Sequence, residues 1–245
     1  MFRPLLIALQ FLTVLPIRIG RAPDAKATGW SLVYYPLVGL LIGALLAAAA
    51  WVLGDVPSLL AASVLLAIWV AVTGALHLDG LADSVDAWVG GQGDRDQTLA
   101  IMKDPRSGPM AVITLVLVLL IKFTALVQIL SDGAWELIVL VPVLGRTALV
   151  LLFLTTPYVR SQGLGSLLAS HLPRRACALA VIFTLLAVLT FFGLETWWLL
   201  AVVAGVLFAL RRLMLRRIEG TTGDTAGALV EITEIVALLA AASMN

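Results

Sequence analysis

The chain is poor in charged residues and in cysteine. Only 13% of its 245 residues are Asp, Glu, Lys or Arg, whereas 61% are hydrophobic and the mean hydropathy is +1.06. Because a soluble domain is about half apolar, this composition indicates an integral membrane protein. The single cysteine, Cys177, lies in an apolar run. It excludes a disulfide or a thiolate-rich metal site within one chain and is interpreted as a small buried hydrophobic residue.

A surplus of positive charge is also missing. The formal net charge is +1, and the basic residues are scattered rather than gathered in one stripe. Nucleic-acid binding relies on a basic face, so no nucleic-acid partner is expected. Neither a repeat of 20–50 residues nor a long linker is evident. Residues 1–245 are therefore expected to form a single integral-membrane domain.

Several stretches are apolar and long enough to cross a bilayer, which takes about 20 residues. An N-terminal run, Pro4 to Ile17, is shorter and has no small-residue cleavage site. It predicts a retained helix that is interfacial or re-entrant. The expected fold is all-α, a polytopic membrane protein of seven transmembrane helices over residues 31–53, 58–76, 109–131, 134–155, 176–194, 196–213 and 226–243.

Lysine and arginine are distributed unevenly over this topology. Fourteen of the 16 belong to the long loops and the flanking helix ends, and the other two, Lys122 and Arg146, lie inside predicted spans. The positive-inside rule therefore predicts cytoplasmic long loops and a C-terminus on the far side. Because the long loops carry most of the chemically capable residues, the functional site is expected at the cytoplasmic surface.

The stretch "HLDGLADSVDAW" places Asp79, Asp83 and Asp86 at i, i+4 and i+7. On a helix these carboxylates lie within about 60° of one another. Their repulsion would destabilise the helix unless a cation compensates. Oxygen ligands without a cysteine or histidine cluster suit Mg²⁺, or alternatively Mn²⁺, and Mg²⁺ combines few carboxylates with substrate phosphates. The stretch predicts a metal site on a helix at the membrane surface; the alternative is a solvated acidic face.

Two other residues of this stretch receive different interpretations. His77 is offset by about 160° from the aspartate face of a continuous helix, so a packing or helix-start role is expected for it. Gly80 weakens a helix by about 1 kcal/mol relative to alanine. It predicts that another part of the chain approaches the backbone closely there.

The following loop, "IMKDPRSGPM", carries Lys103, Arg106 and Ser107. Pro105 and Pro109 restrict its backbone, which indicates a shaped loop. Positioned positive charge beside a metal is what phosphoryl transfer requires. The alternative is a positive-inside anchor, which accounts for the charge but not for the prolines.

Charged residues inside the predicted spans require partners. An unpaired Lys122 or Arg146 would cost at least about 2.5 kcal/mol near the bilayer centre. Glu231 and Glu234 share one face of the last span, which predicts that they line the interior or pair with these two cations. Arg146 is also predicted to reach a substrate phosphate or a carboxylate.

Two more polar residues are candidates for substrate contact. Arg160, in "YVRSQGLG", is predicted to contact an anionic substrate. Asp224, in "TTGDTAG", is either an N-cap or a site residue.

Seven motifs in a fixed order carry a family resemblance. "GALHLDGLADSVDAW", "IMKDPRSGPMAV", "VLGRTAL", "YVRSQGLG" and "TTGDTAGALVEITE", with "LQFLTVLPI" and "YYPLVGLLIG" upstream, cover nearly the whole chain. With these motifs the chain resembles the cobalamin synthase family, adenosylcobinamide-GDP ribazoletransferase. The resemblance implies a Mg²⁺-requiring enzyme of cobalamin (vitamin B12) biosynthesis at the inner face of the cytoplasmic membrane. Its substrates would be adenosylcobinamide-GDP and α-ribazole, or its 5′-phosphate, and its products adenosylcobalamin, or its 5′-phosphate, and GMP.

Joining this resemblance to the residue analysis gives a hypothesis for the mechanism. The metal ligands would be Asp79, Asp83 and Asp86, and Asp86 would also take the proton of the attacking hydroxyl. Developing charge would be neutralised by Lys103, Arg106 and Arg146. The predicted substrate contacts are Ser107, Arg146, Arg160, Asp224 and Glu231.

Other functions remain as alternatives at this point. A CDP-alcohol phosphotransferase would use a similar aspartate helix, but its D-G-x-x-A-R signature is incomplete here, because no arginine follows Ala82. A transporter would place its charges in symmetric halves, which the sequence does not show. Membrane lipids are expected partners, and association into homo-oligomers stays open.

The predicted topology can be tested with a reporter fused after Asn245. Seven spans with cytoplasmic long loops place this end on the far side of the membrane. A reporter active only outside the cytoplasm should therefore give signal. A cytoplasmic reporter signal at this position would contradict the seven-span topology.

Overall fold

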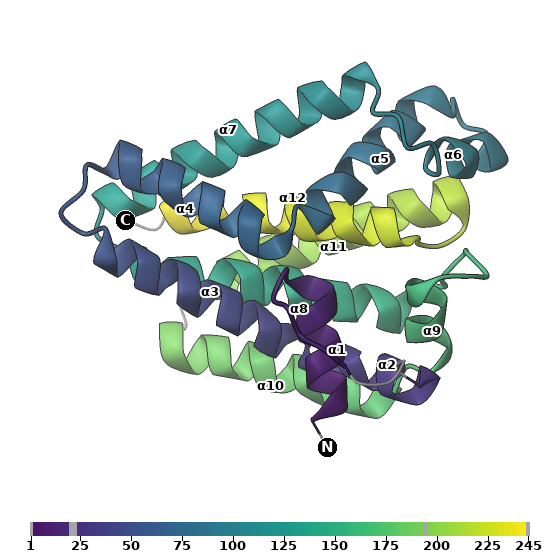
Figure 1. The fold of residues 1–245 in the computed structure, drawn as a ribbon, viewed down its shortest axis with the longest axis horizontal. Coiled ribbons are helices and arrows are strands. Elements are labelled where there is room, and N and C mark those ends of the chain that lie inside the picture. The colour runs from purple at the N-terminus through teal and green to yellow at the C-terminus, as the bar shows by residue number, and fades with distance from the viewer. Residues whose placement is uncertain (1, 20–23, 194–195, 244–245) are drawn as a thin grey trace.

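Helices make up nearly all of the chain that the structure describes (Figure 1). This computed structural model describes residues 2–19, 24–193 and 196–243. The α-helices are α1 (Arg3–Leu12), α2 (Ala25–Ser31), α3 (Tyr35–Val52), α4 (Ser58–Thr73), α5 (Leu76–Gly90), α6 (Arg95–Ile101), α7 (Pro109–Ser131), α8 (Leu140–Thr155), α9 (Leu164–Ser170), α10 (Arg174–Phe192), α11 (Trp197–Ile218) and α12 (Gly223–Ala242). Short 3₁₀ turns, η1 (Leu32–Tyr34) and η2 (Trp135–Val139), precede α3 and α8. The predicted all-α fold is confirmed.

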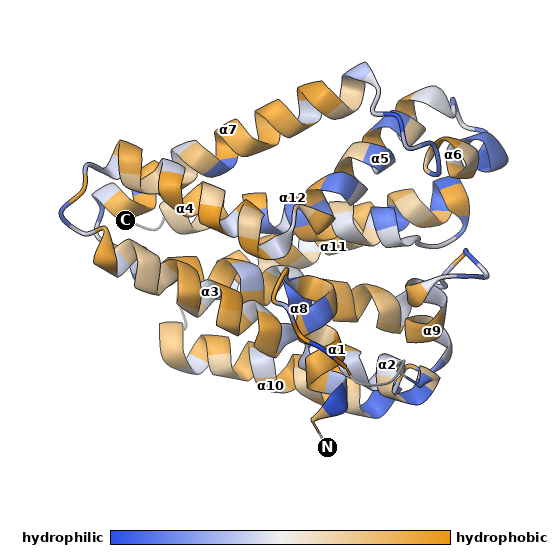
Figure 2. Ribbon diagram, viewed as in Figure 1, coloured by the Kyte–Doolittle hydropathy of each residue, from blue (hydrophilic) through white to orange (hydrophobic). Residues whose placement is uncertain are grey.

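Six helical units among the described residues are long and apolar enough to cross a membrane, and a bent pair brings the number to as many as seven. Figure 2 shows hydrophobic residues along the long helices and many of the hydrophilic ones at the end of the molecule that carries α6. The chain is therefore a polytopic membrane protein. The six units are Ala25–Val52, Pro109–Ser131, Trp135–Thr155, Arg174–Phe192, Trp197–Ile218 and Gly223–Ala242.

The bent pair consists of α4 and α5, which meet at an angle of 85°. The span predicted over 58–76 ends earlier, at Thr73, because Gly74 and Ala75 both take left-handed conformations, with φ of 60° and 55°. A left-handed residue commonly terminates an α-helix. The aspartate-bearing stretch is therefore a separate helix that leaves the direction of α4.

The N-terminal run forms α1, a helix of only 10 residues. It packs against α2 and α3 rather than crossing the molecule. The expectation of a helix too short to span is confirmed.

Glycines allow α3 and α8 to pack backbone to backbone. A Cβ atom on Gly39 would lie 2.5 Å from the carbonyl oxygen of Pro142, and one on Gly43 would lie 2.6 Å from that of Val139. Small residues at helix crossings are typical of membrane proteins, in which close van der Waals packing replaces the hydrophobic effect.

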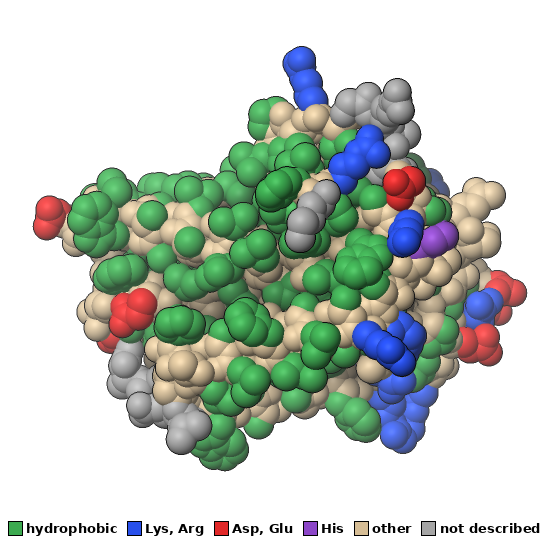
Figure 3. Space-filling model, turned by 90° about the horizontal axis from the view of Figure 1, so that it is seen from below, with side chains coloured by type: hydrophobic (Ala, Val, Ile, Leu, Met, Phe, Trp, Pro, Cys, Tyr) green, Lys and Arg blue, Asp and Glu red, His purple; other side chains and the backbone are tan. Residues whose placement is uncertain are grey.

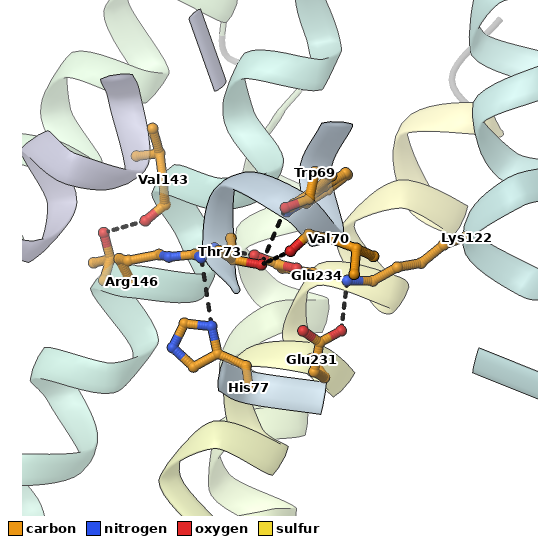
Figure 4. A network of polar contacts seen from close by, with 10 residues as sticks. Trp69, Val70, Thr73, His77, Lys122, Val143, Arg146, Glu231 and Glu234 are labelled. Carbon is orange, nitrogen blue, oxygen red and sulfur yellow. Dashed lines mark hydrogen bonds and ion pairs between the residues drawn. The ribbon is translucent and has the colours of Figure 1, made fainter. Parts of the chain in front are cut away.

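A buried ion network joins α7, α8 and α12 (Figure 4). Lys122 of α7 donates to Glu231 and Glu234 of α12, with Nζ···O distances of 2.5 and 2.7 Å, and Arg146 of α8 pairs with Glu234. The Lys122 ammonium also lies 4.6 Å from the ring centroid of Trp69 in α4. All four charged side chains are at most 6% exposed. Two cations and two anions thus neutralise one another, and the predicted pairing of Lys122 and Arg146 with the glutamates is confirmed.

Replacing Lys122 with Met should destabilise the protein strongly, because Glu231 and Glu234 would lose a shared cation in an apolar interior. Removing one partner of a buried ion pair typically lowers the free energy of unfolding by about 3–5 kcal/mol. Thermal unfolding in detergent should show a clearly lower midpoint. Lys122→Met combined with Glu231→Gln removes one charge of each sign and should recover part of the loss. An unchanged midpoint in Lys122→Met would contradict a stabilising role for the network.

Candidate functional site

The aspartate helix α5 is held against the start of α12 by two glycines. A Cβ atom on Gly80 would lie 2.8 Å from the carbonyl oxygen of Asp224, and one on Gly227 would lie 3.3 Å from Cα of His77. The close backbone approach predicted at Gly80 is confirmed. It brings the first turn of α12, and with it Asp224, to the aspartate helix.

The aspartates of α5 differ in their surroundings. Asp79 is exposed, whereas Asp83 and Asp86 are half-buried. Asp83 lies close enough to Asp79, Asp86, Asp224 and Arg160 for all four charges to act on its carboxylate. Within the described residues, neither Asp79 nor Asp83 makes an ion pair or a side-chain hydrogen bond. These two carboxylates are therefore available to a ligand.

Asp86 has a structural role that the spacing of the three aspartates in the sequence did not indicate. Its two carboxylate oxygens accept hydrogen bonds from the backbone N–H groups of Gly108 and Ala111, at 2.5 and 2.9 Å. It thus caps the start of α7. A Cβ atom on Gly108 would lie 2.7 Å from Oδ1 of Asp86, so a side chain at this position would require the carboxylate to shift. The predicted roles of Asp86 as ligand and base remain predictions, and in this arrangement they compete with the cap.

No group of three or more His, Cys, Asp or Glu side chains within the described ranges is placed so that it could hold a metal ion. The predicted set of Asp79, Asp83 and Asp86 is therefore not gathered at one point, because Asp86 turns to α7. Two carboxylates still fit Mg²⁺, which usually binds one or two of them and completes its shell with water and substrate phosphates. A metal role for Asp79 and Asp83 remains a prediction that suits the donors present.

Arg160 and Asp224 form an ion pair beside this face. Arg160 Nη2 lies 2.6 Å from Asp224 Oδ2. The segment of Arg160 is positioned by the backbone N–H of Val159, which donates to the carbonyl of Thr221 at 3.0 Å. Thr222, rather than Asp224, is the N-cap of α12. The N-cap alternative for Asp224 is wrong, and its carboxylate faces Arg160 instead.

Arg160 lines two neighbouring cavities. The outer cavity, of about 700 Å³, is also lined by Lys103. The inner cavity, of about 290 Å³, is also lined by His77, Asp79 and Asp224. Gln162 and Gly163 line both cavities. The structure thus brings four of the predicted site residues, Asp79, Lys103, Arg160 and Asp224, around adjoining spaces.

Arg106 and Ser107 are placed differently. Both are exposed, and neither is among the residues that line the inner or the outer cavity. Arg106 pairs with Asp104 at 2.6 Å, and its hydrogen bond lowers the pKa of the Asp104 carboxyl to about 2. Asp104 thus occupies two of the donor positions that Arg106 could offer to an anionic substrate.

Arg146 and Glu231, both predicted to contact substrate, belong to the buried ion network. Arg146 is not among the residues that line the inner cavity, but its Nη2 lies 3.4 Å from Nδ1 of His77, which does line it. His77 was not expected in the site, because it lies off the aspartate face of the helical wheel. It lines the cavity because the cavity extends around the first turn of α5, immediately after the bend at Gly74. Gly74 is a local sequence signal for a helix end, but the predicted span continued past it to residue 76.

Comparison of the sequence with known proteins identifies the family to which the chain belongs. The model of the family described as cobalamin-5-phosphate synthase matches residues 4–242. The adenosylcobinamide-GDP ribazoletransferase of Pseudomonas putida (strain W619) is 55% identical over 96% of this chain and 97% of its own length. The protein of the same name from Pseudomonas aeruginosa PAO1 is 56% identical over 98% of each chain, and that from Stutzerimonas stutzeri A1501 is 55% identical over 96% of each. No solved structure matches.

Replacing Asp86 with Ala should lower the stability of the protein by about 0.5–2 kcal/mol, as expected for a lost helix cap. Asp79→Ala is the matched control, because Asp79 lies on the same helix without such contacts. The midpoint of unfolding in detergent should fall for Asp86→Ala and stay near that of the wild type for Asp79→Ala. Equal midpoints in the two variants would contradict the capping role.

Proposed function

This chain belongs to the cobalamin-5-phosphate synthase family, and on that premise we propose that it transfers the phosphorylated cobinamide of adenosylcobinamide-GDP to α-ribazole or its 5′-phosphate. The products are adenosylcobalamin, or its 5′-phosphate, and GMP. The observation that carries the proposal is the likeness, over nearly the full length of both chains, to enzymes named adenosylcobinamide-GDP ribazoletransferase.

The geometry of the site supports transfer from a pyrophosphate. Arg160 and Lys103 present positive charge to the outer cavity, where the charge on the pyrophosphate oxygens needs stabilisation. Asp79 and Asp83 would hold Mg²⁺, which when bound supplies further positive charge to the phosphates. Cations and carboxylates on adjoining cavity walls are what such a reaction requires.

In the proposed reaction, the 3′-hydroxyl of the ribazole attacks the phosphorus attached to cobinamide. A new oxygen–phosphorus bond forms, the bond from this phosphorus to the bridging oxygen breaks, and GMP leaves with that oxygen. The proton of the hydroxyl passes to a carboxylate of the site. Arg160 keeps its guanidinium in place through the ion pair with Asp224 and is positioned to bind the phosphate oxygens.

We also propose that the site faces the cytoplasm from the inner membrane. Fourteen of the 16 lysines and arginines belong to the long-loop side of the sequence. Figure 3 shows Lys and Arg side chains toward one end of the visible face and hydrophobic side chains over much of the rest. This asymmetry is typical of the cytoplasmic ends of membrane helices.

Replacing Asp83 with Asn should reduce the release of GMP from adenosylcobinamide-GDP and α-ribazole by about a hundredfold or more, because a carboxylate that neutralises and holds the cation is lost. The assay uses the protein in detergent or liposomes with Mg²⁺. Asp96→Asn is the control, since Asp96 is exposed in α6 and pairs only with Arg95.

Near-normal turnover in Asp83→Asn would contradict the metal role of the aspartate helix. Absence of GMP release by the wild type with both substrates and Mg²⁺ would contradict the proposed function and favour a CDP-alcohol type of transferase.

A further inference from the structure

One wall of the inner cavity is aromatic. Phe11 and Tyr35 stack with ring centroids 6.4 Å apart, and Phe153 and Tyr158 stack at 5.9 Å with an interplanar angle of 14°. All four residues line the cavity. Flat aromatic surfaces bind planar rings through stacking and dispersion contacts. This wall therefore favours a ligand that carries an aromatic ring.

The other lining residues are polar and charged. Asp79, Arg160 and Asp224 line the same cavity, and the Nε atom of Arg160 is buried without a hydrogen-bond partner in the described part of the chain. An unpaired buried donor is uncommon in a native protein and indicates a place for a ligand or water. The ligand should thus have an apolar ring at one end and hydroxyl or phosphate groups at the other.

His77 adds a donor whose orientation is fixed. Arginine can only donate hydrogen bonds, so the contact from Arg146 makes Nδ1 of His77 an acceptor and places the proton of the neutral ring on Nε2. Arg146 is itself held by Glu234 (Figure 4). The buried ion network thereby fixes the donor position on His77, a residue that lines the cavity.

Size separates the two substrates of the proposed reaction. A volume of about 290 Å³ lies at the lower end of ligand pockets. A corrinoid joined to GDP is far too large for it, whereas a single nucleoside is of suitable size. Guanine would have to pair its edge with the charged side chains of Asp79, Arg160 and Asp224, which a ribose and a phosphate would also need. The benzimidazole of a ribazole has only one free ring nitrogen, an acceptor.

We propose that the inner cavity binds the acceptor nucleoside of the reaction. The benzimidazole ring lies against the aromatic wall, and its free nitrogen accepts from Nε2 of His77. The ribose points toward Asp79 and Arg160, where the outer cavity receives the pyrophosphate. This inference rests on the proposed function and divides its two substrates between the two cavities.

A substitution at the rim of the inner cavity tests this assignment. Leu164 lines the cavity and is 36% exposed, so Leu164→Trp narrows it without disturbing the core. Leu167 lies on the same helix, is 39% exposed and is not among the lining residues. Leu167→Trp is therefore the matched control.

Leu164→Trp should raise KM for α-ribazole by about tenfold or more and leave KM for adenosylcobinamide-GDP within about twofold. The added indole takes up volume that the nucleoside would occupy, and a misfit of one methylene already costs about tenfold or more. Leu167→Trp should change neither value. A rise confined to adenosylcobinamide-GDP, or no change in either KM, would overturn the assignment.

Equilibrium binding of α-ribazole to the full chain separates this inference from the proposed function. Wild-type protein that binds α-ribazole, with weaker binding to Leu164→Trp, supports the cavity assignment even if no GMP is released. Equal affinity of both proteins overturns it, whatever the turnover.

The role of His77 has its own test. The side-chain N–H of Gln can replace Nε2, whereas Asn replaces the Nδ1 position. His77→Gln should keep KM for α-ribazole closer to that of the wild type than His77→Asn does. The reverse order would show that His77 serves only as the partner of Arg146 and would overturn its part in binding.

Discussion

Charge neutrality in an apolar interior is the constraint on which the architecture depends. The network of Lys122, Arg146, Glu231 and Glu234 places ionised groups where each alone would be strongly unfavourable, so their helices must lie at fixed distances from one another. α12 contributes both anions and is therefore fixed between α7 and α8. The first turn of α12 then lies against α5. The polar residues of the site lie at this contact, around the start of both helices.

The same network links the membrane interior to the site. Arg146 pairs with Glu234 on one side and contacts His77, a residue of the cavity wall, on the other. The position of the buried charges therefore constrains the orientation of the His77 ring. This polar cluster, although its desolvation opposes folding, is thus in contact with a residue that lines the inner cavity. This accounts for two cations and two anions in a bundle whose other contacts are largely apolar.

Much of this could be predicted from the sequence, because it follows from local or compositional rules. Hydropathy identified the long helices, periodicity placed Asp79 and Asp83 on one face, and the absence of other partners led to the pairing of Lys122 with the glutamates. Features that depend on contacts between distant residues were not predictable. The cap that Asp86 provides for α7 joins residues 22 positions apart, and the cavity that His77 lines is formed by residues as distant in sequence as Phe11 and Gly227. A helical wheel contains neither contact, so Asp86 was predicted only as a metal ligand and proton acceptor, and His77 was left out of the site.

The hydrogen bonds of Asp86 to the start of α7 have a consequence for variation in this protein. They close residues 87–107 into a loop whose two ends are fixed to each other. The entropy cost of lengthening a closed loop is small, about 0.6 kcal/mol for each doubling. Insertions or deletions between Asp104 and Ser107, after the packed helix α6, can therefore change where Lys103 reaches while the aspartate helix keeps its place. Related enzymes could adapt to donors of different bulk by altering this one segment, without rebuilding the part of the site that is anchored in the membrane.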